Sequence, residues 1–225
     1  EQVHKDLDPV GFTGDYYHRP MFTSDKWVNL RAGVMFIDPS GKGKDETGFA
    51  VVKESCGTLF ATECSGHLGG YEDHVLRALA ITAKMQRCSL ILVEQNFGQG
   101  MFSQLLKPIV QEVWRDPAIG DYVGHGCTIE EVRSSGQKEL RIIDTLEPLL
   151  NQHRLVVDKG VFERDRKIIK GVPEKDQMTY RLAYQLTRIT KDRGCLKHDD
   201  RLDALAGACQ HWVESMAKNR STSAD

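Results

Sequence analysis

Three places in the sequence put carboxylates where a strand ends or a helix begins. Asp38 and Glu94 each follow a short apolar run that predicts a buried strand. Asp200 and Asp203 are three residues apart at the predicted opening of the last helix, so they share one helix face. A charge at the end of a buried strand costs solvation energy unless it is paired. A metal ion is one suitable partner.

The residue types at these positions favour a hard divalent cation. Carboxylate oxygens without accompanying cysteine or histidine suit Mg²⁺ or Mn²⁺. If the two strands are neighbours in a sheet, Asp38 and Glu94 meet at their carboxyl ends, and the start of the last helix can close the site. Two such ions about 4 Å apart are the usual device for phosphodiester cleavage: one activates water and the other stabilises the leaving oxygen.

Each carboxylate also has a simpler explanation. Asp38 precedes Pro39 and can start a turn. Asp199 or Asp200 can cap the last helix, and Glu94 can pair with a lysine. The spacing alone leaves these explanations open beside the metal site.

Hydrophobic patterning predicts the elements that must position these side chains. Apolar runs and turn residues predict strands at 33–38, 48–54, 57–64 and 89–94, within 122–133, and at 155–157. Helical spacing predicts helices at 72–87, 101–114 and 138–151, within 176–189, and from about 199 to 216. Strands come first and then alternate with helices, so the sequence predicts a mixed α/β layer fold.

Length and composition limit the classes of protein. The 225 residues can form one sizeable core, and the net charge of −2 gives no global basic field. None of the six cysteines forms a C-x-x-C pair, so a zinc site is not expected and the thiols are expected to be free in a reducing compartment. No signal peptide or apolar run of membrane-spanning length occurs in the sequence, so no membrane association is expected.

The chain divides into three expected parts. Residues 1–28 show little periodicity and are expected to be an arm or linker remnant. Residues 29–217 are expected to be the folded domain, and 218–225 a flexible tail. The chain begins at Glu1 rather than at a methionine, which indicates a domain taken from a longer protein.

Two basic segments are candidates for contact with nucleic acid. The segment 41–44 reads Gly-Lys-Gly-Lys, but Asp45 follows it, so the phosphate-loop pattern G-x-x-x-x-G-K-[ST] is absent. As a basic loop, it can contact a nucleic-acid backbone beside the acidic site. The stretch 163–193 is rich in Arg and Lys, including Arg164, Arg166, Lys167, Lys170, Arg181, Arg188, Lys191 and Arg193. Its default interpretation is a solvated face, and a DNA-contacting role gains weight only if the acids form a nuclease site.

Several of these segments together resemble a known family. The segments are Phe36-Ile37-Asp38-Pro39-Ser40-Gly41 with Lys44-Asp45-Glu46-Thr47-Gly48, Val93-Glu94-Gln95-Asn96-Phe97-Gly98, Gln137-Lys138-Glu139-Leu140-Arg141 and His198-Asp199-Asp200-Arg201-Leu202-Asp203-Ala204-Leu205. Across about 33–212, the chain resembles the nuclease domain of phage large terminase subunits of the short-tailed type. The resemblance implies an RNase H-like or RuvC-like mixed sheet flanked by helices. It also implies a DNA endonuclease that cuts concatemeric phage genomes during packaging.

The resemblance also implies roles for individual residues. Asp38, Glu94 and Asp203 look like the metal-binding carboxylates, with Asp200 as a fourth catalytic and metal-site residue and Asp45 as an auxiliary acid. The expected cofactor is a pair of Mg²⁺ or Mn²⁺ ions. The candidate DNA contacts are Lys42, Lys44, Lys138, Arg164, Arg166, Lys167 and Lys170.

The implied partners are those of a packaging motor. They are double-stranded DNA, an ATPase motor domain of the same polypeptide, the portal and the small terminase subunit. The implied location is the cytoplasm of the infected bacterial host and the procapsid. This chain lacks a phosphate loop, so it is expected to cut DNA without hydrolysing ATP. A RuvC-like junction resolvase and a non-catalytic DNA-binding or docking module are the alternatives.

Overall fold

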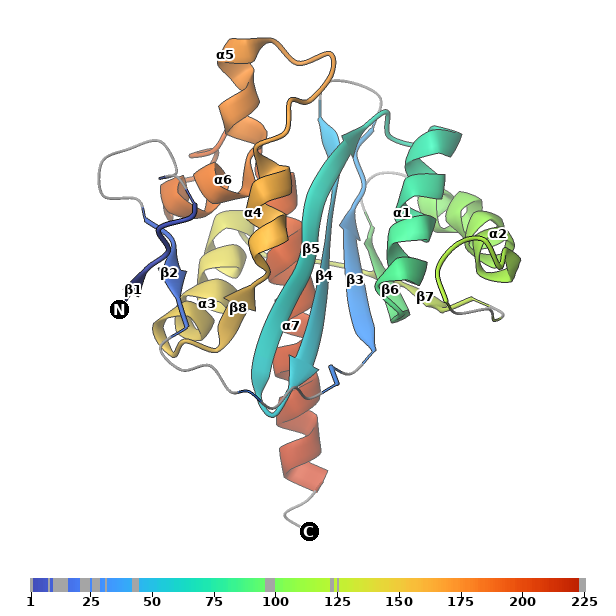
Figure 1. The fold of residues 1–225 in the computed structure, drawn as a ribbon, viewed down its shortest axis with the longest axis horizontal. Helices are drawn as coiled ribbons and strands as arrows, with labels where there is room; N and C mark the ends of the chain where they lie inside the picture. Colours follow the sequence, from blue (N-terminus) through green and yellow to red (C-terminus); the bar gives the residue numbers. More distant parts are fainter. Residues whose placement is uncertain are drawn as a thin grey trace.

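The computed structural model describes residues 2–7, 9, 16–20, 25, 29–30, 32–41, 45–95, 100–121, 124 and 126–222. A six-stranded mixed sheet runs through the centre of the molecule (Figure 1). Its strands, in spatial order, are β7 (Thr128–Val132), β6 (Cys88–Glu94), β3 (Gly33–Asp38), β4 (Glu46–Ser55), β5 (Thr58–Leu68) and β8 (Leu155–Val157).

The meander expected for the first three strands of this sheet forms the antiparallel part, β3-β4-β5. The strands that arrive later pair in parallel, β6 with β3, β7 with β6 and β8 with β5. Parallel neighbours require crossover connections, and helices supply them. Because β3 and β6 are parallel neighbours, their carboxyl ends lie at the same edge of the sheet.

Helices cover both faces of the sheet. On one face lie α1 (Asp73–Met85) and α2 (Met101–Arg115), seen on the right of Figure 1. The other face carries α3 (Lys138–Asn151), α4 (Lys159–Asp165), α6 (Leu182–Arg188) and the long α7 (Asp200–Thr222). Two short elements, α5 (Glu174–Gln177) and the 3₁₀ turn η1 (Met178–Tyr180), connect α4 to α6.

Strand alternation divides the core into two clusters. On β3, Met35 and Ile37 pack with α1 and α2, whereas Val34 and Phe36 pack with α7 and the helices around it. This is the period-two pattern of a strand that is buried on both faces. The mixed sheet flanked by helices that the sequence predicts is therefore confirmed.

The last helix, α7, packs unusually close to strands β3 and β4 of the sheet. Residues 201–209 of α7 are buried on every side. A Cβ at Gly207 would lie 2.5 Å from Phe36, and a Cβ at Gly48 would lie 2.3 Å from the backbone oxygen of Asp200. Both glycines are therefore needed for the close approach of α7 to β3 and β4.

Three segments differ from the sequence-based expectations. The helix expected within 176–189 is split, because Arg181 is extended and Asp165 accepts the backbone N–H groups of Leu182 and Ala183 at 2.8 and 3.0 Å. The last helix continues past Met216 to Thr222, so residues 218–222 of the expected tail are helical. No proline or glycine interrupts that stretch.

Part of the expected N-terminal arm is also structured. β1 (Gln2–Val3) pairs with β2 (His18–Arg19), and Leu7 is buried. Tyr17 packs on Phe162 of α4 with ring centroids 4.3 Å apart. Among the described residues, no helix has the length and apolar character needed to span a bilayer.

Candidate metal centre

The two strand-end carboxylates lie side by side. Ile37 of β3 pairs with Val93 of β6, so the next residues, Asp38 and Glu94, are neighbours at the carboxyl ends of the two strands. Strand alternation turns both toward the face that α7 covers, because Phe36 and Leu92, two residues earlier, belong to that core. Asp38 is 4% exposed and Glu94 is 7% exposed.

Helix α7 adds the third carboxylate. Asp203, one turn into the helix, is fully buried. Asp38, Glu94 and Asp203 each offer one carboxylate oxygen, and these oxygens lie within 4.8 Å of one another. Three buried carboxylates this close repel each other, so the cluster requires positive charge.

Two cations from the start of α3 enter this cluster. Lys138 Nζ lies 3.2 Å from Asp38 Oδ2, 2.9 Å from Asp199 Oδ1 and 3.1 Å from Asp203 Oδ2. Arg141 Nη1 lies 2.8 Å from Asp203 Oδ1, and Arg141 Nη2 lies 3.5 Å from Glu94 Oε1. Burial opposes the ammonium charge, but Asp38, Asp203 and Asp199 together raise the pKa of Lys138. Lys138 is therefore a permanent countercharge in the cluster.

Asp200 differs from the three clustered acids. It begins α7 on the same helix face as Asp203, but it is not one of the three carboxylates whose oxygens converge. Burial, followed by the charge of Asp38, raises the pKa of Asp200 to about 8. At neutral pH this carboxyl is largely protonated, so it adds little to the negative charge of the cluster.

A buried ion triad fixes the start of α7. Arg201 donates to Glu46 through Nε at 2.6 Å and Nη2 at 2.9 Å, and to Asp165 Oδ1 through Nη1 at 2.9 Å. Gln185 Oε1 accepts the backbone N–H of Leu202 at 3.0 Å, which satisfies one of the free donors of the first turn. These contacts hold the turn that carries Asp200 and Asp203.

The predicted auxiliary acid, Asp45, lies outside the cluster. Its side chain is 73% exposed, and its Oδ1 lies 3.6 Å from His198 Nδ1. His198 is buried and stacks on Tyr180 with ring centroids 3.8 Å apart. Asp45 is therefore placed to act on His198 and not among the three converging carboxylates.

The predicted DNA contacts occupy different environments. Lys138 is held in the acidic cluster, and Arg164 pairs with Glu63 at 2.9 Å, which joins α4 to β5. Arg166 is half-buried, whereas Lys167 and Lys170 are exposed. Lys42 and Lys44 lie outside the described residues. The five described cations among them therefore do not form a single exposed surface.

The donor set fits a hard divalent cation. All three converging ligands are carboxylates, the ligand type that Mg²⁺ and Mn²⁺ prefer. Asp203 Oδ1 is buried and accepts no hydrogen bond of regular geometry within the described part of the chain, although Arg141 lies near it. That oxygen has a lone pair available for an ion.

Sequence analysis missed the cations at the site. The sequence assigns Arg141 no role and predicts that Lys138 contacts DNA, whereas both side chains pair with the clustered carboxylates. The two are three residues apart at a helix start, the same spacing as Asp200 and Asp203 on α7. Two cations three residues apart on one helix and two acids three residues apart on another have complementary charges. This pattern could have indicated that the two helix starts pair with each other. The partnership of Arg201 with Glu46 spans 155 residues, and no local pattern indicates it.

Comparison with known proteins gives a family and two solved folds. A family model described as the ribonuclease H-like domain of bacteriophage T7 terminase matches residues 37–155. The large terminase subunit of Enterobacteria phage T3 is 38% identical over 202 residues, which are 90% of this chain and 33% of that protein. The chain thus spans about a third of the length of this curated relative.

Two viral nuclease domains have a similar fold. A terminase nuclease domain of human cytomegalovirus, soaked in Mn and bound to an inhibitor, aligns with a TM-score of 0.52 at 14% identity over 80% of this chain and 82% of that one. The nuclease domain of the large terminase subunit of bacterial virus Sf6 aligns with a TM-score of 0.50 at 14% identity over 81% of this chain and 90% of that one. At this identity, the similarity establishes the fold, which is the RNase H-like fold expected from the sequence.

Proposed function

This chain belongs to the bacteriophage T7 terminase family of ribonuclease H-like domains, and we propose that it is the metal-dependent endonuclease of a viral genome-packaging terminase. Its substrate is concatemeric double-stranded DNA. The observation that carries the proposal is the convergence of buried Asp38, Glu94 and Asp203 at one edge of the sheet. Burying three carboxylates costs much solvation energy and contributes nothing to packing, which favours a functional reason for the cluster.

Asp38, Glu94 and Asp203 are the residues that hold Mg²⁺ or Mn²⁺. A divalent ion held there would supply Lewis-acid chemistry for phosphodiester hydrolysis, and a pair of such ions is the usual device for that reaction. The chain's own contribution is positional. Asp38 and Glu94 project from paired strands, and Asp203 projects from a helix fixed by Arg201, so the carboxylates are oriented before substrate arrives.

Asp200 and Asp45 have secondary roles in this proposal. Asp200 completes the site as a fourth catalytic residue once it loses its proton. Asp45, close to His198, acts as an auxiliary acid outside the three converging carboxylates. Lys42, Lys44, Lys167 and Lys170 are the proposed contacts to the DNA backbone, together with Arg166. Lys138 and Arg164 are less suited to that role, because carboxylates already engage them.

The wider setting of this activity follows from the family. A phage terminase of this type would carry an ATPase motor in the same polypeptide and would work with the portal and the small subunit. It would act in the cytoplasm of the infected host, at the procapsid. The chain's coverage of about a third of the phage T3 relative leaves room for such a motor domain in the full-length protein.

Cleavage of supercoiled plasmid in Mn²⁺, in Mg²⁺ or with a chelator tests the proposal. The chain should nick or linearise plasmid only with a divalent ion. Asp203→Asn should lower the rate by about 10³-fold or more, because a ligand that stabilises transition-state charge by several kcal/mol is weakened. Asp38→Ala should have a similar effect. Asp200→Asn should retain more activity, because Asp200 is outside the converging set.

Asp144→Asn, at an exposed position of α3, is the matched control and should cleave normally. Melting temperatures establish that each variant is folded. Near-normal cleavage by folded Asp203→Asn would overturn the assignment. Metal-independent binding without any cleavage would indicate a non-catalytic DNA-binding module, and a strong preference for branched over linear DNA would indicate a resolvase.

A further inference from the structure

The connection between α4 and α5 presents an unusually exposed apolar side chain. Ile168 is 84% exposed, more than any other exposed large hydrophobic side chain in the described part of the chain. Its neighbours Lys167 and Lys170 are also exposed. The segment 166–173 contains three cations and no acidic residue. An exposed apolar side chain between two exposed lysines is the feature to explain.

This loop is held in a fixed conformation. The side chain of Gln177, 8% exposed, accepts from the backbone N–H of Ile169 at 2.8 Å and donates to the carbonyl oxygens of Ile169 at 2.8 Å and Val172 at 2.6 Å. Val172 N–H donates to Ile169 O at 3.3 Å, and Gly171 has a φ of +85°, which fits a tight turn. Ile168 is therefore held in solvent by an ordered loop, and little entropy would be lost when it binds a partner.

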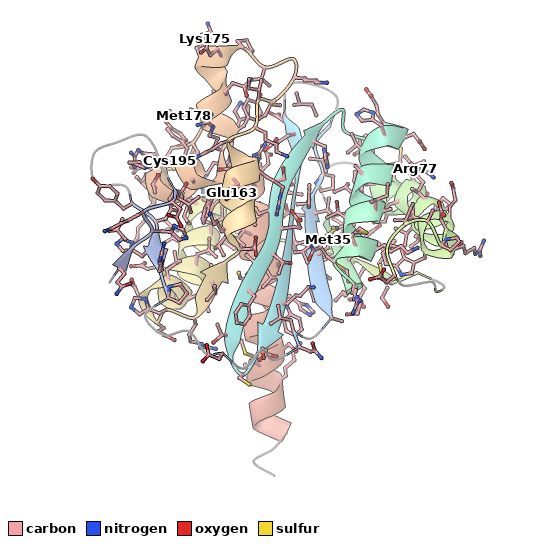
Figure 2. All side chains as sticks on the ribbon, in the orientation of Figure 1. Met35, Arg77, Glu163, Lys175, Met178 and Cys195 are labelled. Carbon is pink, nitrogen blue, oxygen red and sulfur yellow. The ribbon has the colours of Figure 1, made fainter. Side chains whose placement is uncertain are left out.

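The loop and α5 are attached to the segment that leads into the acidic site. Lys197 Nζ lies 2.7 Å from Asp176 Oδ1, and Tyr180 stacks on His198, so α5 and η1 contact the two residues before Asp199. In Figure 1, α5 and its preceding loop project beyond the sheet at the end where β3 stops. Figure 2 shows Lys175 at the tip of this projection. The loop thus extends the molecule at the end that carries the carboxylate cluster.

We propose that the segment 166–173 is a duplex-DNA contact in which Ile168 packs into the minor groove while Lys167 and Lys170 bind phosphates on either side. The inference rests on the proposed nuclease function. Lysines flanking an apolar side chain match the arrangement of a groove wall, where phosphates lie on both sides of sugars and base edges. The absence of any acidic residue in 166–173 favours a polyanion over a protein surface of mixed charge.

Equilibrium binding of a labelled duplex in a chelator tests this contact without cleavage. Ile168→Ser should weaken binding about 5-fold with an unchanged salt dependence, because only apolar contact is lost. The double change Lys167→Ala with Lys170→Ala should weaken binding and reduce the slope of log K against log salt by about 1.8, since two phosphate contacts disappear. Ile168→Leu should bind as the unchanged chain does.

Met85→Ser is the matched control. Met85 is 58% exposed at the end of α1, so the change removes an exposed apolar side chain remote from the loop. It should leave binding unchanged. If Ile168→Ser binds as tightly as the unchanged chain, the contact is wrong and the exposed side chain serves a protein partner instead. Failure of the nuclease proposal would look different, because the unchanged chain itself would then fail to cleave plasmid with Mn²⁺.

Discussion

Lys138 neutralises much of the negative charge in the carboxylate cluster. Its ammonium lies within 3.2 Å of three carboxylates, and two of them, Asp38 and Asp203, belong to the converging set. Lys138→Ala should therefore destabilise the metal-free chain by about 1–3 kcal/mol, because hydrogen bonds to charged groups are lost. Mn²⁺ should then raise the melting temperature of the variant more than that of the unchanged chain, because the ion no longer competes with the ammonium.

Thermal unfolding in a chelator and in saturating Mn²⁺ measures both effects. Lys159→Ala is the control, since Lys159 forms an exposed pair with Glu163 at 3.2 Å and should change neither melting temperature appreciably. An equal or smaller response to Mn²⁺ in Lys138→Ala would mean that the lysine does not compete with the ion.

Asp200 should make stability depend on pH in the absence of metal. Burial, followed by the charge of Asp38, raises its pKa to about 8 in the folded chain, from an ordinary value of 3.8. Between these values the unfolded chain is ionised and the folded chain is protonated, so the contribution of Asp200 to stability decreases as pH rises and levels off above 8. Below pH 3.8, Asp200 is protonated in both the folded and the unfolded chain, so its contribution to the free energy of unfolding no longer changes with pH.

Urea unfolding from pH 5 to 9 with a chelator checks this effect. The free energy of unfolding of the unchanged chain, relative to Asp200→Asn, should fall steadily toward pH 8 and then stay constant. Parallel pH profiles for the two chains would show that Asp200 titrates normally.

At the residue scale, sequence predicted the acids better than the bases. Asp38 and Glu94 could be predicted as neighbours because each ends a buried strand. Asp203 could be added to them because it shares a helix face with Asp200 at the start of α7. The same local logic could not place Lys138 and Arg141 among the acids. Their role depends on how α3 packs against α7, and neither helix specifies this tertiary contact by its own sequence.

Gly48 and Gly207 allow α7 to approach the sheet closely. Gly48 lies against the start of α7, the end of the helix that carries Asp200 and Asp203. A Cβ at Gly48 would lie 2.3 Å from the backbone oxygen of Asp200, and backbone cannot move aside as a flexible side chain can. Gly48→Ala should cost about 1–3 kcal/mol through overpacking and should reduce cleavage by shifting the first turn of α7. Urea unfolding and plasmid cleavage measure the two effects.

Gly41→Ala is the matched control, because a Cβ at Gly41 meets no atom within 4 Å. It should change stability and cleavage little. If Gly48→Ala behaves like Gly41→Ala in both assays, the close approach of α7 is not needed for the site.

Arg201 ties three elements together in the protein interior. It is 3% exposed, and its partners Glu46 of β4 and Asp165 of α4 are 0% and 3% exposed. Burial opposes its charge, but the hydrogen bonds and charge of Glu46 raise the pKa of Arg201. Arg201→Met would leave two buried acids without their partner and should cost about 3–5 kcal/mol, measured by urea unfolding at pH 7.

Arg77→Met tests whether the cost comes from burial. Arg77 of α1, labelled in Figure 2, donates to Glu112 at 2.8 Å, a similar distance, but both side chains are exposed. Its loss should leave the unfolding midpoint nearly unchanged. An Arg201→Met chain as stable as Arg77→Met would contradict the role of the triad.

At the element scale, sequence predicted most strands and helices but not the split helix. The apolar spacing in 176–189 suggested one helix, whereas the chain breaks at Arg181 and restarts at Leu182. The restart is capped by Asp165, 17 residues earlier in the sequence. A cap supplied from another element leaves no local signature.

At the scale of the whole molecule, the order of elements predicted the class of fold but not its sheet order. A meander followed by alternating helices and strands favours a mixed sheet. The positions of β7 and β8 at opposite edges depend on which parallel neighbour each strand finds across a crossover. The proximity of Asp38 and Glu94 needs only one of these pairings, β3 with β6, so it could be predicted without the full sheet order.

A crystal soaked in Mn²⁺ and measured at the manganese absorption edge shows whether a metal ion binds at the carboxylate cluster. We predict anomalous density in contact with one carboxylate oxygen from each of Asp38, Glu94 and Asp203, the three that already converge. The same soak of Asp203→Asn should show that density weakened or lost. Absence of density there, at a Mn²⁺ concentration that supports plasmid cleavage, or density at other residues alone, would contradict the account.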